Sequence, residues 1–380
     1  MRVLVGLSGG VDSAVAAYIL KKQGHDVTCA FMRNWDAYAN NDILGNPSQG
    51  LDDICPQEED YLDAKKVADK LQLPLLRVDF VKEYWDDVFS VFLEETKKGR
   101  TPNPDILCNR HIKFNAFFKY AKSLGFDWVA TGHYARVLHQ EGKNSVMLKG
   151  LDSNKDQTYF LVQVPQEALN HTLFPVGELN KSEVRKIALE LDLAVAQKKD
   201  STGICFIGER HFREFLHNYI PKSAGKIVDI DTNKVVGEHH GVMFYTLGQR
   251  KGMGIGGVEG PWFVVHKDLK SNTLYVAAKE DNDWLKSDEC HVSRINWFGE
   301  MPVGELRCTA KFRYRQKDHP VTVSCQNNLL IVKYEYPIAA VTPGQEAVFY
   351  QGEVCLGGGV IDEVFKDGFT FIERMKRGKL

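Results

Sequence analysis

Short apolar runs alternate with stretches of helical spacing through the first half of the chain. Each apolar run is long enough for one buried strand, and the apolar side chains between the runs recur three or four positions apart. Strands that alternate with amphipathic helices are typical of a parallel sheet covered by helices on both faces. We therefore expect an α/β domain over residues 1–210. The predicted strands are Val3–Leu7, Val27–Met32, Leu75–Phe80 and Trp128–Thr131, and Asn34–Gln57 is a predicted loop.

The pattern changes after residue 210. Short alternating runs separated by Gly and Pro lie between Pro221 and Ala278, which predicts a small central domain over 211–280. Beyond Ser287 apolar and polar side chains alternate, as in Leu306–Tyr314, and the pattern predicts strands only. Half-buried antiparallel strands in a segment of about 100 residues favour a small β-barrel over 281–380.

Composition narrows the class of protein. A chain of 380 residues with 43% hydrophobic and 26% charged side chains is typical of a globular protein with two or three domains. No apolar run approaches the ~20 residues that a membrane span needs, and the first strand leaves no room for a targeting peptide. We therefore expect a cytoplasmic protein without membrane contact. The net charge of −2 gives no overall signal for nucleic-acid binding, so any RNA contact must use local basic patches.

The eight cysteines are scattered and form no CxxC pair, so we expect no metal site among them. In a cytoplasmic protein a disulfide scaffold is not expected either, and a functional cysteine would act as a thiolate. Cys29, Cys290, Cys308 and Cys325 fit small buried apolar residues, the last two on the apolar side of strands. We assign no chemistry to Cys355.

A glycine-rich turn follows the first predicted strand. The string Ser8-Gly-Gly-Val-Asp-Ser13 lies between that strand and a helix, an arrangement in which backbone N–H groups and the helix N-terminus can hold a phosphate. It resembles the loop of the pyrophosphate-loop ATPases, which cleave ATP between its α and β phosphates. No Gly-Lys-Ser/Thr follows, so a Walker-type γ-phosphate transfer is not indicated. Because ligands collect at the carboxyl ends of parallel strands, Met32 and Gly132-His133 are expected in the same pocket.

Several further strings, in order, resemble the tRNA-specific 2-thiouridylases (the MnmA/TrmU family) from end to end. They are Asn103-Pro-Asp-Ile-Leu-Cys108, Lys155-Asp-Gln157, Lys198-Lys-Asp-Ser-Thr-Gly-Ile-Cys205, Thr246-Leu-Gly-Gln-Arg-Lys-Gly252, Lys311-Phe-Arg-Tyr-Arg-Gln316, Thr342-Pro-Gly-Gln345 and Cys355-Leu-Gly-Gly-Gly359. The resemblance implies a catalytic domain of the adenine nucleotide alpha hydrolase type, a small central domain and a C-terminal β-barrel.

The resemblance also implies a chemistry that fits these residues. ATP would adenylate the C2 oxygen of the wobble uridine, AMP would leave with that oxygen, and sulfur would arrive from a cysteine persulfide. Cys205 matches the persulfide position, Cys108 the nucleophile that assists sulfur release and closes a transient disulfide with Cys205, and Asp105 the acid/base.

Ligand-binding positions follow from the same resemblance. The ATP-binding residues are Gly6, Leu7, Ser8, Gly9, Gly10, Val11, Asp12, Ser13, Met32 and Gly132, and the tRNA-binding residues are Asn103, Pro104, Asp105, His133, Lys155, Asp156, Gln157, Arg313, Tyr314 and Gln345. Expected partners are ATP, tRNAs for Lys, Glu and Gln, and a sulfur donor that is either a cysteine desulfurase or a relay protein. Mg²⁺ is expected with ATP, with Asp12 as a weak candidate ligand. Basic residues near Cys205 are a candidate RNA-phosphate surface: Lys181, Arg185, Lys186, Lys198, Lys199, Arg210 and Arg213.

Two other functions remain open at this point. A pyrophosphate-loop ligase of the amidating or argininosuccinate type would act on a small molecule and turn over ATP without tRNA. A non-catalytic RNA-binding protein with a nucleotide-sensing domain would leave bound tRNA without added sulfur. The paired cysteine strings favour the thiouridylase over both.

Overall fold

The computed structural model describes residues 1–37, 39–44, 56–200, 203–205, 207, 212–255, 260–279 and 282–377. Its first domain contains a sheet of five parallel strands in the order β3 (Leu75–Asp79), β2 (Asp26–Arg33), β1 (Arg2–Gly6), β4 (Trp128–Ala130) and β7 (Thr172–Leu173). The helices of the chain are α1 Val11–Lys22, α2 Pro56–Leu71, α3 Val81–Tyr84, α4 Ser90–Lys97, α5 Pro104–Cys108, α6 Phe117–Ser123, α7 Thr158–Leu161, α8 Gln166–Leu169, α9 Lys181–Glu190, α10 Phe212–Leu216 and α11 Phe371–Arg377. The other helical segments are the π-helical η1 Trp85–Phe89 and η2 Asn109–Ala116 and the 3-10 turns η3 Val242–Phe244 and η4 Asp283–Leu285.

Alternate side chains of the central strand face opposite helical layers. Val3 and Val5 of β1 pack in one cluster with side chains of α1, α2 and α9. Leu4 packs in a second cluster with aromatic side chains from η1, η2 and α6. A strand buried on both sides is continuously apolar, which is why Val3–Leu7 stands out in the sequence. The α/β prediction with helices on both faces is confirmed.

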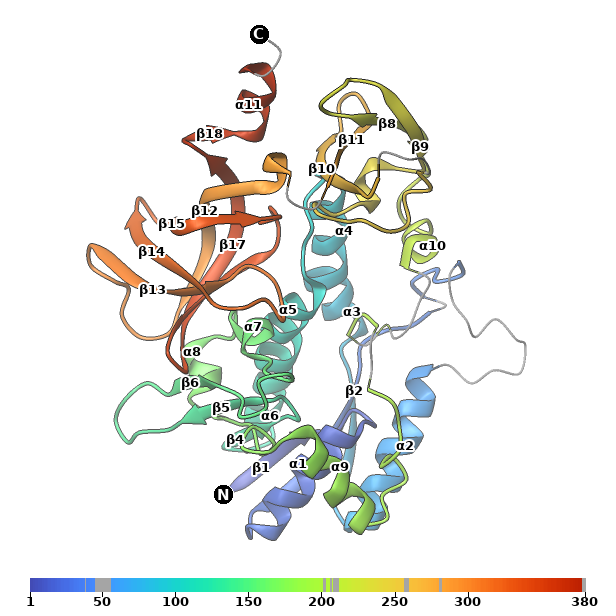
Figure 1. The fold of residues 1–380 in the computed structure, drawn as a ribbon. Coiled ribbons are helices and arrows are strands. Elements are labelled where there is room, and N and C mark those ends of the chain that lie inside the picture. Colours follow the sequence, from blue (N-terminus) through green and yellow to red (C-terminus); the bar gives the residue numbers. More distant parts are fainter. Residues whose placement is uncertain are drawn as a thin grey trace.

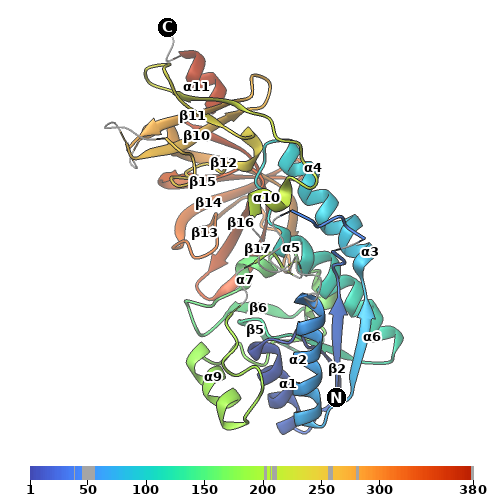
Figure 2. The ribbon, with the colours of Figure 1, turned by 90° about the vertical axis from the view of Figure 1, so that its right-hand side faces the viewer.

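The central domain is a four-stranded sheet in the order β10 (Trp262–Asp268), β11 (Thr273–Ala278), β8 (Gly225–Asp229) and β9 (Val235–His239). The long helical segment that ends in α4 runs up from the first domain to contact η3 of this domain (Figure 1). The central domain and the C-terminal barrel lie together at one end of the molecule, and the parallel sheet lies at the other (Figure 2).

The C-terminal domain is a closed antiparallel barrel, as predicted. Its strands follow the order β12 (Lys286–Trp297), β15 (Leu329–Ala339), β14 (His319–Gln326), β13 (Glu305–Lys311), β16 (Glu346–Gln351) and β17 (Val354–Lys366), and β12 pairs with β17 to close it. The hairpin of β5 (Ala135–Leu138) and β6 (Val146–Lys149) joins β17 through Leu148 and Val354. A hairpin from the first 210 residues thus extends the sheet of the barrel.

Two expectations about the C-terminal half are wrong. The chain does not continue as strands only, because helix α11 follows the short strand β18 (Phe369–Thr370). Thr370 and Glu373 exchange hydrogen bonds there, with Thr370 N to Glu373 Oε2 at 2.8 Å, the reciprocal pattern that starts helices. Cys325 is exposed because it lies beside the β14–β15 turn, where no layer covers the strand, whereas Cys29 and Cys290 are buried as expected and Cys308 is partly buried.

Candidate functional site

The glycine-rich turn between β1 and α1 is closed by its own serines. The backbone N–H of Ser8 donates to Ser13 Oγ at 3.2 Å, and that hydroxyl donates to the carbonyl of Gly10 at 3.1 Å. Gly9 has a φ of +76°, and a Cβ there would lie 2.2 Å from the carbonyl oxygen of Asp60. Only glycine fits this position, since it has no Cβ and adopts positive φ readily.

Gly132 and Met32 lie against the same turn. A Cβ on Gly132 would lie 2.6 Å from the backbone nitrogen of Ser13, and a Cβ on Gly6 would lie 3.1 Å from Cε of Met32. The predicted ATP-binding positions therefore come together at the carboxyl ends of β1, β2 and β4. A bare backbone at the start of α1, without a side-chain cap on Gly10, suits the phosphates of a nucleotide.

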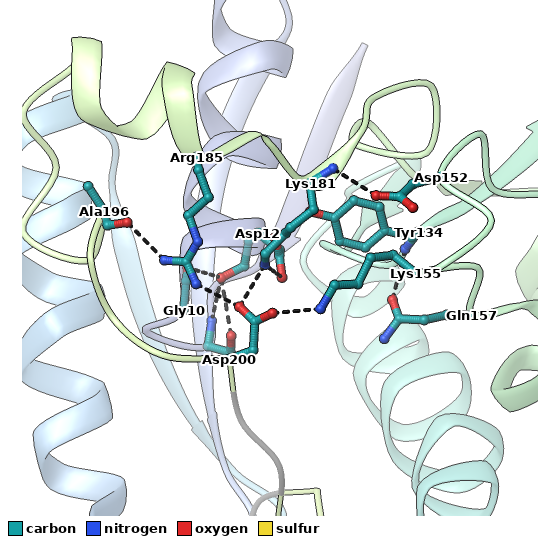
Figure 3. A network of polar contacts seen from close by, with 12 residues as sticks. Gly10, Asp12, Tyr134, Asp152, Lys155, Gln157, Lys181, Arg185, Ala196 and Asp200 are labelled. Atoms are coloured by element: carbon teal, nitrogen blue, oxygen red, sulfur yellow. Dashed lines mark hydrogen bonds and ion pairs between the residues drawn. The ribbon is translucent and has the colours of Figure 1, made fainter. Parts of the chain in front are cut away.

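Asp12 lies in the first turn of α1 and is held there by two neighbouring side chains. Its Oδ1 accepts hydrogen bonds from Tyr134 OH and Lys181 Nζ, both at 2.7 Å, and its Oδ2 accepts from Lys181 Nζ at 2.8 Å (Figure 3). Burial and the Asp12 charge raise the pKa of Tyr134, so Tyr134 stays a neutral donor. These hydrogen bonds take up part of the acceptor capacity of the Asp12 carboxylate, and its role as an Mg²⁺ ligand stays a prediction. Within the part of the chain that the structure describes, no group of three or more His, Cys, Asp or Glu could hold a metal ion.

The second constellation is built on the short helix α5. Asn103 caps it, its side-chain oxygen accepting from the backbone N–H groups of Asp105 at 3.0 Å and Ile106 at 3.3 Å, and Pro104 follows at the first helical position. Cys108, at the end of α5, is fully buried in an apolar cluster. Cys108 is buried because α5 and the π-helical segment η2 follow one another directly and pack their inner side on the core.

Cys108 and Cys205, 97 positions apart, meet in this cluster. The Cys108 thiol donates to the Cys205 sulfur at an Sγ–Sγ distance of 3.6 Å. The Cys205 backbone is held on both sides: its N–H donates to Asp105 Oδ1 at 3.0 Å, and its carbonyl accepts from Tyr84 OH at 2.7 Å. The fold thus brings together the three residues predicted to carry the chemistry.

The electrostatic environment shifts the pKa values of the two thiols in opposite directions. The hydrogen bond from Cys108, and next the ammonium of Lys113, lower the pKa of Cys205 although burial opposes them. Burial and the Cys205 charge raise the pKa of Cys108 well above its usual value. Burial also raises the pKa of Asp105. Of the two thiols, Cys205 is therefore the one that loses its proton more readily, while burial favours the protonated forms of Cys108 and Asp105.

Lys113 is a functional side chain that the sequence reasoning missed. Its ammonium hydrogen-bonds to the Cys205 sulfur and lies 3.4 Å from His133 Nε2. Burial opposes the charge of Lys113, but the sulfurs of Cys205 and Cys108 outweigh it and raise the pKa of Lys113. The sequence held one signal for this role: Lys113 lies between the apolar Ile112 and Phe114, both buried, and five positions after Cys108.

His133 is buried, not presented to solvent. Its Nδ1 lies 2.7 Å from Thr131 Oγ1, and burial followed by the Lys113 charge lowers its pKa well below the usual value. A neutral ring that donates from Nδ1 to Thr131 and accepts at Nε2 from Lys113 satisfies both contacts. The tRNA contact predicted for His133 stays a prediction. In the structure, His133 is oriented by Thr131 and accepts a hydrogen bond from Lys113.

The predicted tRNA-contact segment 155–157 is tied into the protein. Lys155 Nζ donates to Asp200 Oδ2 at 2.7 Å, and the buried Asp156 accepts from Thr158 Oγ1 at 2.9 Å. Gln157 Oε1 accepts from the backbone N–H of Tyr134 at 2.8 Å. Lys155 is the member of this segment whose cationic head lies toward the glycine-rich turn (Figure 3).

The residues of the barrel that were predicted to contact tRNA instead contact the other two domains in this structure. Arg313 Nη2 donates to the carbonyl of Leu247 in the central domain at 2.7 Å. Tyr314 packs its ring on Phe160 with 4.4 Å between centroids. Gln345 Nε2 donates to the carbonyl of Thr101 at 2.7 Å, just before the segment that starts α5. The barrel thus holds the cysteine-bearing segment in place, and tRNA binding by these three residues stays a prediction.

The basic residues between 181 and 213 do not form one surface. Lys181 and Arg185 lie at the glycine-rich turn, and Lys198 donates to the Gly9 carbonyl at 3.2 Å as well as to Asp60 and Asp63. Lys186 is exposed beside Glu190, and Arg213 donates to the Gly252 carbonyl. Arg210 lies outside the described residues.

Comparison with known proteins agrees with this geometry. Three family models match in order: tRNA methyl transferase HUP domain over 1–209, tRNA methyl transferase PRC-barrel domain over 213–278, and aminomethyltransferase β-barrel domain over 287–361. The chain is similar to proteins named tRNA-specific 2-thiouridylase MnmA. It is 56% identical to that of Mycoplasma capricolum (96% of this chain, 99% of the relative) and 52% identical to that of Streptococcus thermophilus (97% and 96%).

Solved structures are similar only in part. A 4-thiouridine synthetase in complex with RNA and bound ATP matches 55% of this chain and 46% of its own, with 15% identity and a TM-score of 0.32, too weak a likeness to carry an argument. Separately, no helix among the described residues is long and apolar enough to cross a membrane.

Proposed function

Because the chain belongs to the family of tRNA-specific 2-thiouridylases, we propose that it replaces the C2 oxygen of the wobble uridine of tRNA by sulfur at the expense of ATP. The observation that carries this is the meeting of Cys108 and Cys205 at 3.6 Å, beside Asp105, in a chain that begins with a pyrophosphate loop. A ligase for small molecules needs no such thiol pair, and a non-catalytic RNA-binding protein needs neither thiol.

The first half-reaction activates the base. Attack of the uridine C2 oxygen on the α-phosphorus of ATP releases pyrophosphate and leaves the oxygen bonded to AMP. The glycine-rich turn, with Gly9 at positive φ and Gly132 against Ser13, supports binding of the phosphates. Asp105 stands beside Cys205 with a raised pKa, which suits a group that takes and returns one proton.

The second half-reaction delivers sulfur. A persulfide on Cys205 attacks C2 through its outer sulfur, AMP leaves with the former oxygen, and the base is then linked to Cys205 through two sulfurs. Cys108, after losing its proton, attacks the Cys205 sulfur; this forms the Cys108–Cys205 disulfide and releases the thiolated base. An external dithiol then reduces the disulfide. The 3.6 Å separation supports this step, since a disulfide needs the sulfurs about 2 Å apart.

Finer features of the proposal follow from the family. The expected substrates are the tRNAs for Lys, Glu and Gln, and the expected sulfur donor is a cysteine desulfurase or a relay protein. Mg²⁺ is expected to accompany ATP, and the expected location is the cytoplasm.

The test is a reconstituted reaction with unmodified tRNA, ATP and a sulfur source, read by mass spectrometry of the nucleosides. Wild type should add one sulfur for one oxygen in uridine, and Cys205→Ser should add none while still binding tRNA. Cys325→Ser, the same change at an exposed cysteine of the barrel, is the matched control and should behave as wild type. Thiolation by the Cys205→Ser variant, or by wild type without ATP, would overturn the proposal. ATP turnover that ignores tRNA would favour the ligase instead.

A further inference from the structure

Tyr84 is a fully buried tyrosine whose hydroxyl contacts the backbone of Cys205. The hydroxyl donates to the Cys205 carbonyl at 2.7 Å, and the ring packs edge-on against Trp35 with 6.1 Å between centroids. Burial, followed by the charges of the two thiols, raises the pKa of Tyr84 well above its usual value. The hydroxyl therefore keeps its proton and is a fixed donor to Cys205.

The Cys205 backbone is held between two helical segments. Its carbonyl accepts from Tyr84, the last residue of α3, and its N–H donates to Asp105 Oδ1 on α5 at 3.0 Å. Helix α3 contacts η2, the segment that continues α5, and α5 contacts η1, the segment that continues α3 (Figure 1). Cys108 is the last residue of α5. The packing of these helices thus fixes where Cys205 stands relative to Cys108.

Sulfur release requires the two sulfurs to approach each other. The Sγ atoms of Cys108 and Cys205 lie 3.6 Å apart, and a disulfide joins sulfurs at about 2.05 Å, so they must close by ~1.5 Å. In this step the Cys108 thiolate attacks the Cys205 sulfur, and the bond from that sulfur to the sulfur on the base breaks. The electron pair leaves with the thiolated base, which takes up the proton that Cys108 lost. A misplacement of about 1 Å at a reacting centre can cost about 100-fold in rate, so the position of the Cys205 backbone bears directly on this step.

We propose that Tyr84 is a positioning residue for sulfur release, whose hydroxyl holds Cys205 within reach of Cys108 through the Cys205 carbonyl. The inference rests on the proposed function and concerns its second half-reaction alone. Loss of the hydroxyl removes this donor from the Cys205 carbonyl and lets the cysteine move away from Cys108. Because pyrophosphate leaves before the thiols react, tRNA affinity and pyrophosphate release should not depend on Tyr84.

The first test measures how readily the Cys108–Cys205 disulfide forms in mixtures of reduced and oxidised dithiothreitol, without ATP or tRNA. Tyr84→Phe removes only the hydroxyl and keeps the ring. Its equilibrium constant for disulfide formation should be about tenfold lower than that of wild type, which corresponds to ~1.4 kcal/mol and is typical of one hydrogen bond. Tyr219→Phe is the matched control. Tyr219 packs on the same aromatic cluster but donates to the Asn40 carbonyl at 2.7 Å, so its variant should keep the wild-type constant.

The second test follows a single turnover of the sulfur-loaded enzyme with ATP and unmodified tRNA. Tyr84→Phe should bind tRNA and release pyrophosphate as wild type does, but free thiolated tRNA should appear about tenfold more slowly. The covalent adduct of Cys205 with tRNA should accumulate on non-reducing denaturing gels. The rate of release should fall by the same factor at every pH, because the Tyr84 hydroxyl stays protonated. A pH profile whose inflection moves in Tyr84→Phe would indicate proton transfer by Tyr84 and would overturn the positioning role.

Thermal melts separate this role from a general loss of stability. Both tyrosine variants lose one hydrogen bond to a backbone carbonyl, so their melting temperatures should fall by similar amounts. An unchanged disulfide constant in Tyr84→Phe, or an equal fall in Tyr219→Phe, overturns the proposal. Wild type that forms the disulfide but adds no sulfur to tRNA would refute the proposed function. The dithiothreitol equilibrium would still decide whether Tyr84 positions Cys205.

Discussion

Removing the ammonium of Lys113 should raise the pKa of Cys205 and so reduce the fraction of Cys205 that is a thiolate. Lys113 hydrogen-bonds to the Cys205 sulfur, and the hydrogen bond from Cys108 is the other interaction that lowers the pKa of Cys205. Lys113→Met keeps much of the stem volume and removes the charge. Lys113→Arg keeps the charge and a donor, so it should restore much of the effect.

The magnitude follows from Coulomb's law in a protein environment. Two unit charges 4 Å apart interact by about 4 kcal/mol at an effective dielectric constant of ~20. An ionised Asp105 opposes the effect of Lys113 on the pKa of Cys205, so we take about half of this value, ~2 kcal/mol, as the net effect of Lys113. At 1.36 kcal/mol per factor of ten, the thiolate population of Cys205 near neutral pH should fall about 30-fold.

The assay is iodoacetamide alkylation from pH 6 to 10, followed by mass spectrometry of the peptide that contains Cys205. Lys113→Met should slow alkylation of Cys205 about 30-fold at pH 7 and shift its rise to higher pH. Cys325, exposed in the barrel, is an internal standard whose rate should be the same in all variants. Equal Cys205 rates in wild type and Lys113→Met at pH 7 would refute the assignment of Lys113.

Two further predictions concern stability. Gly9→Ala should lower the free energy of unfolding by at least about 1–2 kcal/mol in thermal melts, because φ is +76° and the new Cβ would meet the Asp60 carbonyl at 2.2 Å. Gly10→Ala is its control: no contact of a Cβ there is shorter than 3.5 Å, so an equal loss in both variants would contradict the reasoning. Burial raises the pKa of Glu346 to about 7 from 4.5, so its stabilising contribution is complete below pH 4.5 and is lost as pH rises through 7. Compared with wild type in urea titrations, Glu346→Gln should gain about 3 kcal/mol between pH 5 and pH 8, and a pH-independent difference would exclude this role.

The architecture of the first domain could be predicted because its signals are local. The segment from Val3 to Leu7 is apolar throughout because both faces of β1 are covered, and Gly9 in the string that follows has a backbone geometry that only glycine meets. The barrel strands were also predictable from a local signal, the alternation of apolar and polar side chains. That the β5–β6 hairpin joins the barrel could not be predicted, because its pairing partner there, β17, lies more than 200 residues away in the sequence.

The sequence could predict which residues carry the candidate chemistry, but not how they are arranged in space. Motif resemblance singled out Cys108, Cys205 and Asp105, but no spacing along the chain indicates that two thiols 97 positions apart lie 3.6 Å from each other. Lys113 escaped notice because a lone lysine in a helical stretch is usually a solvated side chain. Only its position beside His133 and Cys205 makes it a cation that lowers the pKa of the Cys205 thiol.

The amino-acid order by itself determined the alternating strands and helices of the first domain, the alternation of the barrel strands and the loop that suits a phosphate, since these depend on side-chain period and on backbone freedom over a few residues. Tertiary structure alone decided which charges meet: Asp200 with Lys155, Lys181 and Arg185, and Lys113 with Cys205. The physical reason is that interactions between charged groups depend on distance through space and on burial, and neither quantity is encoded in the local pattern of the chain.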